Sequence, residues 1–137
     1  MGEALTVGVR RERGCVVVTV AGEIDIITVT RLRQTLFDLT AGGHPLVVDL
    51  DQVSFIDSAG LAALVGTAKR ATAGGGSLHV VCAQPNTGKL FQLTGLDRRI
   101  PLARTLDEAM QAAARPGPHR DSEPPDGGQA ASPVLDG

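Results

Sequence analysis

A serine between an acid and two small residues is the best candidate for chemistry in this sequence. Ser58 follows Asp57 and precedes Ala59 and Gly60. Small neighbours leave a hydroxyl accessible, so the active site of another protein could reach this turn. The alternative is structural, because a serine that precedes a helix often only caps it by accepting a hydrogen bond from the N–H of Gly60 or Leu61.

Two catalytic motifs can be compared with the chain and neither fits. The nucleophile elbow of hydrolases has glycines two residues before and after the serine, but Ile56 occupies the first of these places and no histidine is placed as the base. Gly88-Lys89 resembles part of a phosphate-binding loop, which would need glycine at Ala83 and Ser or Thr at Leu90. We therefore expect a binding protein rather than an enzyme.

Metal-ligating residues are scattered. Cys15 and Cys82 lie in apolar, strand-like runs, which favours buried, reduced thiols over a disulfide or a metal site. His44, His79 and His119 are isolated, and none forms a cluster with ligand spacing. We expect no metal and no cofactor.

The stretch 46–71 must position Ser58. Residues 46–50 form an apolar, valine-rich run, which is typical of a strand covered on both faces. A helix is predicted over 58–73, because apolar residues recur at helical spacing. They are Leu61, Leu64, Val65 and Ala68.

The remaining elements indicate an α/β fold. Alternating residues from Leu5 to Val9 and the run 15–20 predict a β-hairpin that turns at Gly14, after which Glu23 and Asp25 are expected in a loop. The later elements alternate between helices and strands, which predicts a mixed sheet of about five strands with about four helices, in which strand 46–50 is central. The predicted elements are helix 28–39, strand 77–82, helix 86–93, strand 100–102 and helix 106–114.

A change of composition divides the chain into two parts. Residues 1–114 are expected to form one domain around a single core. Residues 115–137 hold five of the eight prolines and few apolar residues. Such a segment cannot bury enough surface to offset its ordering entropy, so we expect a disordered Pro/Gly-rich tail.

Composition also excludes several kinds of partner. The chain has three Phe and no Trp or Tyr, which argues against stacking surfaces for single-stranded nucleic acid. Basic and acidic side chains are equal in number over residues 1–114, so no basic face for DNA or RNA is expected. Neither a signal peptide nor a window of roughly 18 apolar residues is present, so we expect a cytoplasmic protein without membrane partners.

Three segments resemble a known family. GEID at 22–25, VVDLDQVSFIDSAGL at 47–61 and TLDEA at 105–109 are similar to the anti-sigma factor antagonists, the bacterial branch of the STAS (sulfate transporter and anti-sigma factor antagonist) domains. The likeness covers about residues 5–114, and the D-S-x-G-L segment is its most specific part. The family often has Ser or Thr after the key serine, where this chain has Ala59.

The resemblance implies a regulated binding function. In that family an anti-sigma factor that is itself a serine kinase phosphorylates this serine, which implies Ser58 as the phosphoacceptor. Asp25 and Asp57 would be nearby acids that shape the kinase-docking surface, together with Ala59 and Gly60. The implied partners are this kinase and a serine phosphatase, with no cofactor.

Two further readings stay open. The chain could instead be a STAS subunit that is never phosphorylated and supports a lipid-transport ATPase or a stress-signalling complex. Neighbouring genes would discriminate, since kinase or sigma-factor genes favour the switch and permease genes favour the subunit. A small hydrolase that uses Ser58 is a third reading, weakened by the missing base and oxyanion donors.

Overall fold

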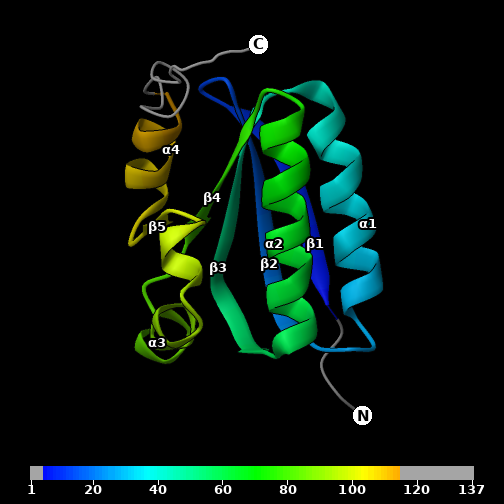
Figure 1. Ribbon diagram of the computed structural model, residues 1–137, viewed down its shortest axis with the longest axis vertical. Coiled ribbons are helices and arrows are strands. Elements are labelled where there is room, and N and C mark those ends of the chain that lie inside the picture. The colour runs from blue at the N-terminus through cyan, green and yellow to red at the C-terminus, as the bar shows by residue number, and fades with distance from the viewer. Residues whose placement is uncertain (1–4, 115–137) are drawn as a thin grey trace.

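The structure is a computed structural model that describes residues 5–114, and it is built around one five-stranded sheet with the strand order β1-β2-β3-β4-β5 (Figure 1). The expected tail at 115–137 lies outside the described residues. The strands are β1 (Thr6–Glu12), β2 (Cys15–Ile24), β3 (Pro45–Ile56), β4 (Ser77–Val81) and β5 (Leu102–Ala103). The α-helices are α1 (Val29–Leu39), α2 (Ser58–Ala73), α3 (Pro85–Thr94) and α4 (Leu106–Ala114), with two short 3-10 helices, η1 (Thr40–Gly42) and η2 (Leu96–Arg98).

The predicted mixed sheet is confirmed. β1 pairs with β2 in the antiparallel sense. The other three neighbouring pairs, β2 with β3, β3 with β4 and β4 with β5, are parallel. The hairpin turns at Arg13 and Gly14, both with positive φ, as a two-residue connection favours. β1 is longer than expected and extends to Glu12, which pairs with Cys15. Glu23 belongs to β2 rather than to the following loop, so that part of the prediction is wrong.

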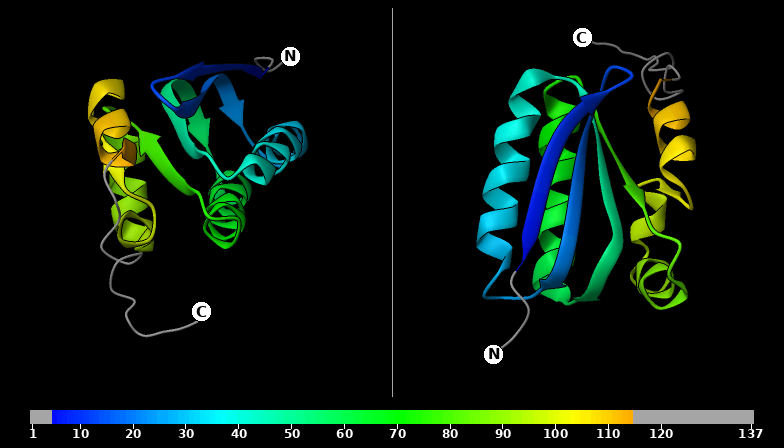
Figure 2. Two further views of the ribbon diagram at one scale, coloured as in Figure 1. Left: turned by 90° about the horizontal axis from the view of Figure 1, so that it is seen from above. Right: turned by 180° about the vertical axis from the view of Figure 1, so that it is seen from behind.

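Helices cover both faces of the sheet (Figure 2). α1 and α2 pack side by side over one face, where they cover the larger hydrophobic core, which includes Leu32 and Leu64 and, from α3, Phe91. α4 covers part of the other face, where Met110 packs with Val17 and Val47. Strand β3 therefore lies in the middle of the sheet and is covered on both sides, as its valine-rich sequence predicts.

Strand β3 is much longer than the predicted 46–50, since it continues to Ile56. Its pairing with β2 shifts register between Thr19 and Ala21, which lets the strand bend and run on through polar residues. The two strands still pair at their ends, where Ile24 lies opposite Ile56. β3 consequently delivers the next two residues, Asp57 and Ser58, to the carboxyl-terminal edge of the sheet.

Candidate functional site

Helix α2 begins directly after β3 and is capped by Asp57. This residue has an extended backbone, with φ −107° and ψ −171°, and its Oδ1 accepts hydrogen bonds from the N–H groups of Ala59 at 2.9 Å and Gly60 at 3.2 Å. The N–H of Asp57 donates to the carbonyl oxygen of Ile24 at 3.1 Å. The cap is therefore attached to the end of β2 as well as to the helix.

Ser58 is the first residue of α2, so the alternative in which its hydroxyl caps the helix is wrong. Both Asp and Ser are good N-cap residues, and the extended backbone selects the acid here. The side chain of Ser58 is exposed, and its Oγ makes no hydrogen bond to any residue within 5–114. The hydroxyl is thus presented to solvent at the start of a capped helix.

Gly60 has a different role from the one expected. It is buried, and a Cβ at this position would lie 2.6 Å from Cγ1 of Ile56 and 2.7 Å from Cγ2 of Ile24. The residue therefore allows the first turn of α2 to approach the ends of β2 and β3, and it does not open the turn to solvent. Ala59 is half-buried against the core. The exposed part of the motif is Ser58 itself.

Asp25 follows the neighbouring strand and organises the β2–α1 turn. Its Oδ1 accepts from the N–H groups of Thr28 and Ile27, each at 2.9 Å. These bonds, the one from Thr28 foremost, hold the pKa of the Asp25 carboxyl below its usual value, although desolvation opposes them. Asp25 is therefore ionised at neutral pH. Because Ile24 pairs with Ile56, Asp25 and Asp57 follow paired residues, and both acids lie at the same edge of the sheet.

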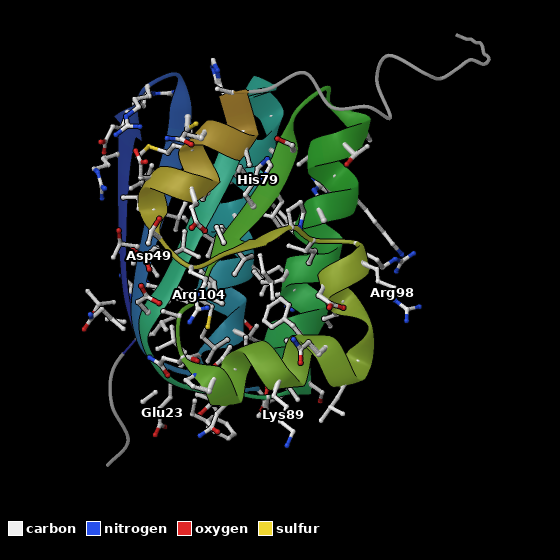
Figure 3. All side chains as sticks on the ribbon, turned by 90° about the vertical axis from the view of Figure 1, so that its left-hand side faces the viewer. Glu23, Asp49, His79, Lys89, Arg98 and Arg104 are labelled. Carbon is white, nitrogen blue, oxygen red and sulfur yellow. The ribbon has the colours of Figure 1, made fainter. Side chains whose placement is uncertain are left out.

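Three exposed apolar side chains at this edge were missed by sequence reasoning. Ile26 is 72% exposed, Ile27 83% and Phe55 50%, and we call this set the apolar rim. Phe55 pairs with Glu23, which Figure 3 places at the end of the sheet, and Ile26 and Ile27 follow shortly after. The sequence signal that could have revealed this surface is the apolar pair Ile26-Ile27, which directly follows Asp25 in a short turn. Exposed apolar side chains gathered at one edge are typical of a protein-binding surface.

Other chemistry-bearing groups lie away from Ser58. Cys15 and Cys82 are buried free thiols, as predicted, and burial raises the pKa of each. His79 is buried in β4, and its desolvation lowers the pKa of the imidazole. Among residues 5–114, no group of three or more His, Cys, Asp or Glu could hold a metal ion. None of the described helices is long and apolar enough to cross a membrane.

The geometry agrees with the comparisons to known proteins. The family model described as "STAS domain" matches residues 6–109. The chain belongs to the STAS domain family. An anti-sigma-B factor antagonist of Bacillus subtilis is 34% identical to this STAS chain over 107 residues, which cover 78% of the chain and 98% of the relative. One from Staphylococcus epidermidis is 38% identical over 80 residues, covering 58% and 74% respectively.

A solved structure supports the same family at the level of the fold. The crystal structure of an anti-sigma factor antagonist from Mycobacterium paratuberculosis is 37% identical and superposes with a TM-score of 0.76. The match covers 82% of this STAS chain and 96% of that one. The five-stranded mixed sheet with four helices is therefore the STAS architecture, as the sequence resemblance implied.

Proposed function

We propose that this protein is an anti-sigma factor antagonist that works as a binding switch. In its unphosphorylated state it binds an anti-sigma factor serine kinase in the cytoplasm and so releases the sigma factor. Phosphorylation of Ser58 ends this binding, and a serine phosphatase restores it. The names of the relatives support the antagonist role. The observation that carries the switch is the exposed Ser58 hydroxyl, which forms no hydrogen bond to the described residues.

The fold should tolerate phosphate at Ser58. A phosphoserine carries nearly two negative charges, and at the N-terminus of α2 the helix dipole favours them by roughly 0.3–1 kcal/mol. The hydroxyl is exposed, so the phosphate displaces no core side chain. The neighbouring half-buried Asp57 carboxylate opposes the added charge, but the phosphate on exposed Ser58 stays in contact with solvent, which screens the repulsion. Phosphorylation therefore changes the surface while the fold is kept.

For a partner docked on this edge, the free energy of binding depends on apolar burial and on the cost of desolvating the phosphate. The apolar rim would be buried in the complex, which favours binding through the removal of Ile27, Ile26 and Phe55 from water. A phosphate in the same interface must be desolvated beside the carboxylates of Asp57 and Asp25, and juxtaposed like charges cost several kcal/mol. Since about 1.4 kcal/mol is a factor of ten in affinity, one phosphate is sufficient to dissociate the complex.

The proposal is tested with candidate anti-sigma factor kinases and two variants of the full chain. Ser58→Ala should bind the kinase with near wild-type affinity, because Ala keeps the apolar rim and the Asp57 cap. Ser58→Asp should bind much more weakly, because it adds a charge where the phosphate would be. Equal affinities for Ser58→Asp and the wild type, measured by calorimetry, would overturn the switch and leave the non-phosphorylated STAS subunit as the better account.

A further inference from the structure

We propose that the groove between α2 and the segment after η2 binds a single-chain amphipathic anion, of which a fatty-acid carboxylate is the simplest form. The groove encloses about 410 Å³, which falls within the usual range for small-molecule sites. It is lined from one wall by the C-terminal half of α2 and from the other by Arg99 and Ile100. The α2 residues are Val65, Ala68, Lys69, Thr72 and Ala73.

The floor of this groove is apolar. Val65 and Ala68 pack against the core but remain partly exposed, and Ile100 is fully buried behind them. Val65 and Ala68 therefore have two roles, since they belong to the apolar stripe that packs on the core and also expose part of their surface to this groove. An alkyl chain placed here would remove that apolar surface from water, which contributes about 25 cal/mol per Å².

The walls of the groove carry two cations. Lys69 comes from α2 and Arg99 from the segment after η2, and both side chains are exposed. The ion pairs within residues 5–114 are Arg10–Glu12 and Arg13–Asp107, so neither cation is paired with a described acid. The neighbouring Arg70 is different, since its guanidinium stacks 4.5 Å above the ring of Phe37. An apolar floor between two available cations matches a ligand with one alkyl chain and one negative head.

The position of the groove separates it from the proposed switch. Ser58 begins α2, whereas the lining residues start at Val65 and extend to Ala73 at the other end. A helix of 16 residues is about 24 Å long. A ligand in the groove therefore leaves the Ser58 hydroxyl and the apolar rim uncovered, and the site does not depend on the phosphorylation proposal.

Binding of dodecanoate to the full chain, below the concentration at which it forms micelles, tests the proposal. We expect saturable binding of one molecule per chain, with NMR shifts concentrated at Val65, Ala68 and Ile100. Dodecyltrimethylammonium has the same chain length and the opposite charge, so it should bind more weakly. Equal binding of the two amphiphiles, or no saturable binding of dodecanoate, would overturn the proposal.

Charge-removing variants test which side chains bind the carboxylate head group. Lys69→Gln and Arg99→Gln should each weaken dodecanoate binding about two- to five-fold, which corresponds to one exposed charge. Arg98→Gln is the matched control, because Arg98 is adjacent to Arg99 and its side chain is exposed (Figure 3), whereas it is not among the residues that line the groove. Loss of binding in Arg98→Gln that equals the loss in Arg99→Gln would contradict the assignment.

Filling the groove provides the last test. Ala68→Phe should abolish dodecanoate binding by occupying the floor, while the circular dichroism spectrum stays that of the wild type. The charge variants carry the test if this variant does not fold. If the groove is instead an interface between two copies, the wild type should dimerise without binding dodecanoate and Ala68→Phe should be monomeric, which would overturn the ligand proposal.

Discussion

The carboxylate oxygen Oδ1 of Asp57 lies 2.9 Å from the amide nitrogen of Ala59 and caps helix α2. Because of this hydrogen bond, the two adjacent polar residues of the motif, Asp57 and Ser58, have different roles. Asp57 stabilises the start of the helix, and Ser58 is left without a hydrogen bond to the described part of the chain. Chemical modification of Ser58 therefore removes no structural contact, and the consequences can be tested residue by residue.

The first prediction concerns the cap. Asp57→Ala removes the acceptor for two N–H groups and should lower the free energy of unfolding by about 0.5–2 kcal/mol. Ser58→Ala is the matched control and should change it by less than about 0.5 kcal/mol, as is usual for an exposed side chain. Urea unfolding followed by circular dichroism measures both. An equal loss in the two variants would mean that the serine hydroxyl also contributes to the cap.

The second prediction concerns the close approach at Gly60. In Gly60→Ala the added methyl group would lie within 2.7 Å of Ile24 and Ile56 side-chain atoms, and relieving this overlap should cost about 1–3 kcal/mol of stability. Gly88→Ala, inside α3, is the control, because a Cβ there meets no atom within 4 Å. It should stabilise the protein by about 0.5–1 kcal/mol through the unfolded state and helix propensity. Destabilisation of both variants alike would contradict this packing.

The third prediction is a pH dependence that originates at His79. The side chain is buried, its Nδ1 has no hydrogen-bond partner among the described residues, and its Nε2 lies 3.1 Å from Oγ of Ser77. Burial lowers the pKa of the folded state below the reference value of 6.5. The unfolded chain therefore binds this proton more readily, so stability is present above pH 6.5 and is lost as the pH falls toward the folded pKa.

Removing the imidazole should remove this part of the slope. We expect His79→Leu to show a weaker decrease of the unfolding free energy below pH 6.5 than the wild type, measured by urea titrations at a series of pH values. His44→Gln provides the control at an exposed histidine and should keep the wild-type profile. An unchanged slope in His79→Leu would show that the acid sensitivity arises elsewhere.

The fourth prediction concerns the apolar rim. Ile27→Ser should weaken binding of the anti-sigma factor kinase by about ten-fold or more, because burial of an isoleucine side chain contributes about 1.5–3 kcal/mol. Leu93→Ser is the control, since Leu93 is 75% exposed and belongs to α3, which carries no residue of the apolar rim. Both variants should unfold at nearly the wild-type urea concentration. Similar affinities for the two variants would place the kinase on another surface.

Much of the fold could be predicted, because the residues that form apolar runs and stripes in the sequence are the ones that pack in the core. The apolar run at 46–50 is the centre of the sheet, and the stripe that begins at Leu61 gives α2 with its ends at Ser58 and Ala73. The length of β3 could not be predicted, because Asp51, Gln52 and Ser54 interrupt the apolar pattern and the segment 51–56 is held by pairing with β2. Such pairing depends on long-range contacts rather than on local propensity.

The candidate site was predicted in part, for a similar reason. The family resemblance implied that Asp25 and Asp57 lie near Ser58, and the structure places the three residues at one edge of the sheet. The sequence did not reveal that Asp57, rather than Ser58, caps α2. Asp and Ser cap helices about equally well, and the backbone conformation decides between them. The buried position of Gly60 required knowledge of Ile24, which lies far away in the sequence.

The central claim is that Ser58 is the phosphoacceptor of a binding switch. Intact-mass analysis of the full chain, before and after incubation with a candidate anti-sigma factor kinase and ATP, tests it most directly. We predict the addition of one phosphate to the wild type and to Ser54→Ala, with the site mapped to Ser58, and no addition to Ser58→Ala. A phosphate that appears equally on Ser58→Ala, or that maps to another residue of the wild type, would contradict the account.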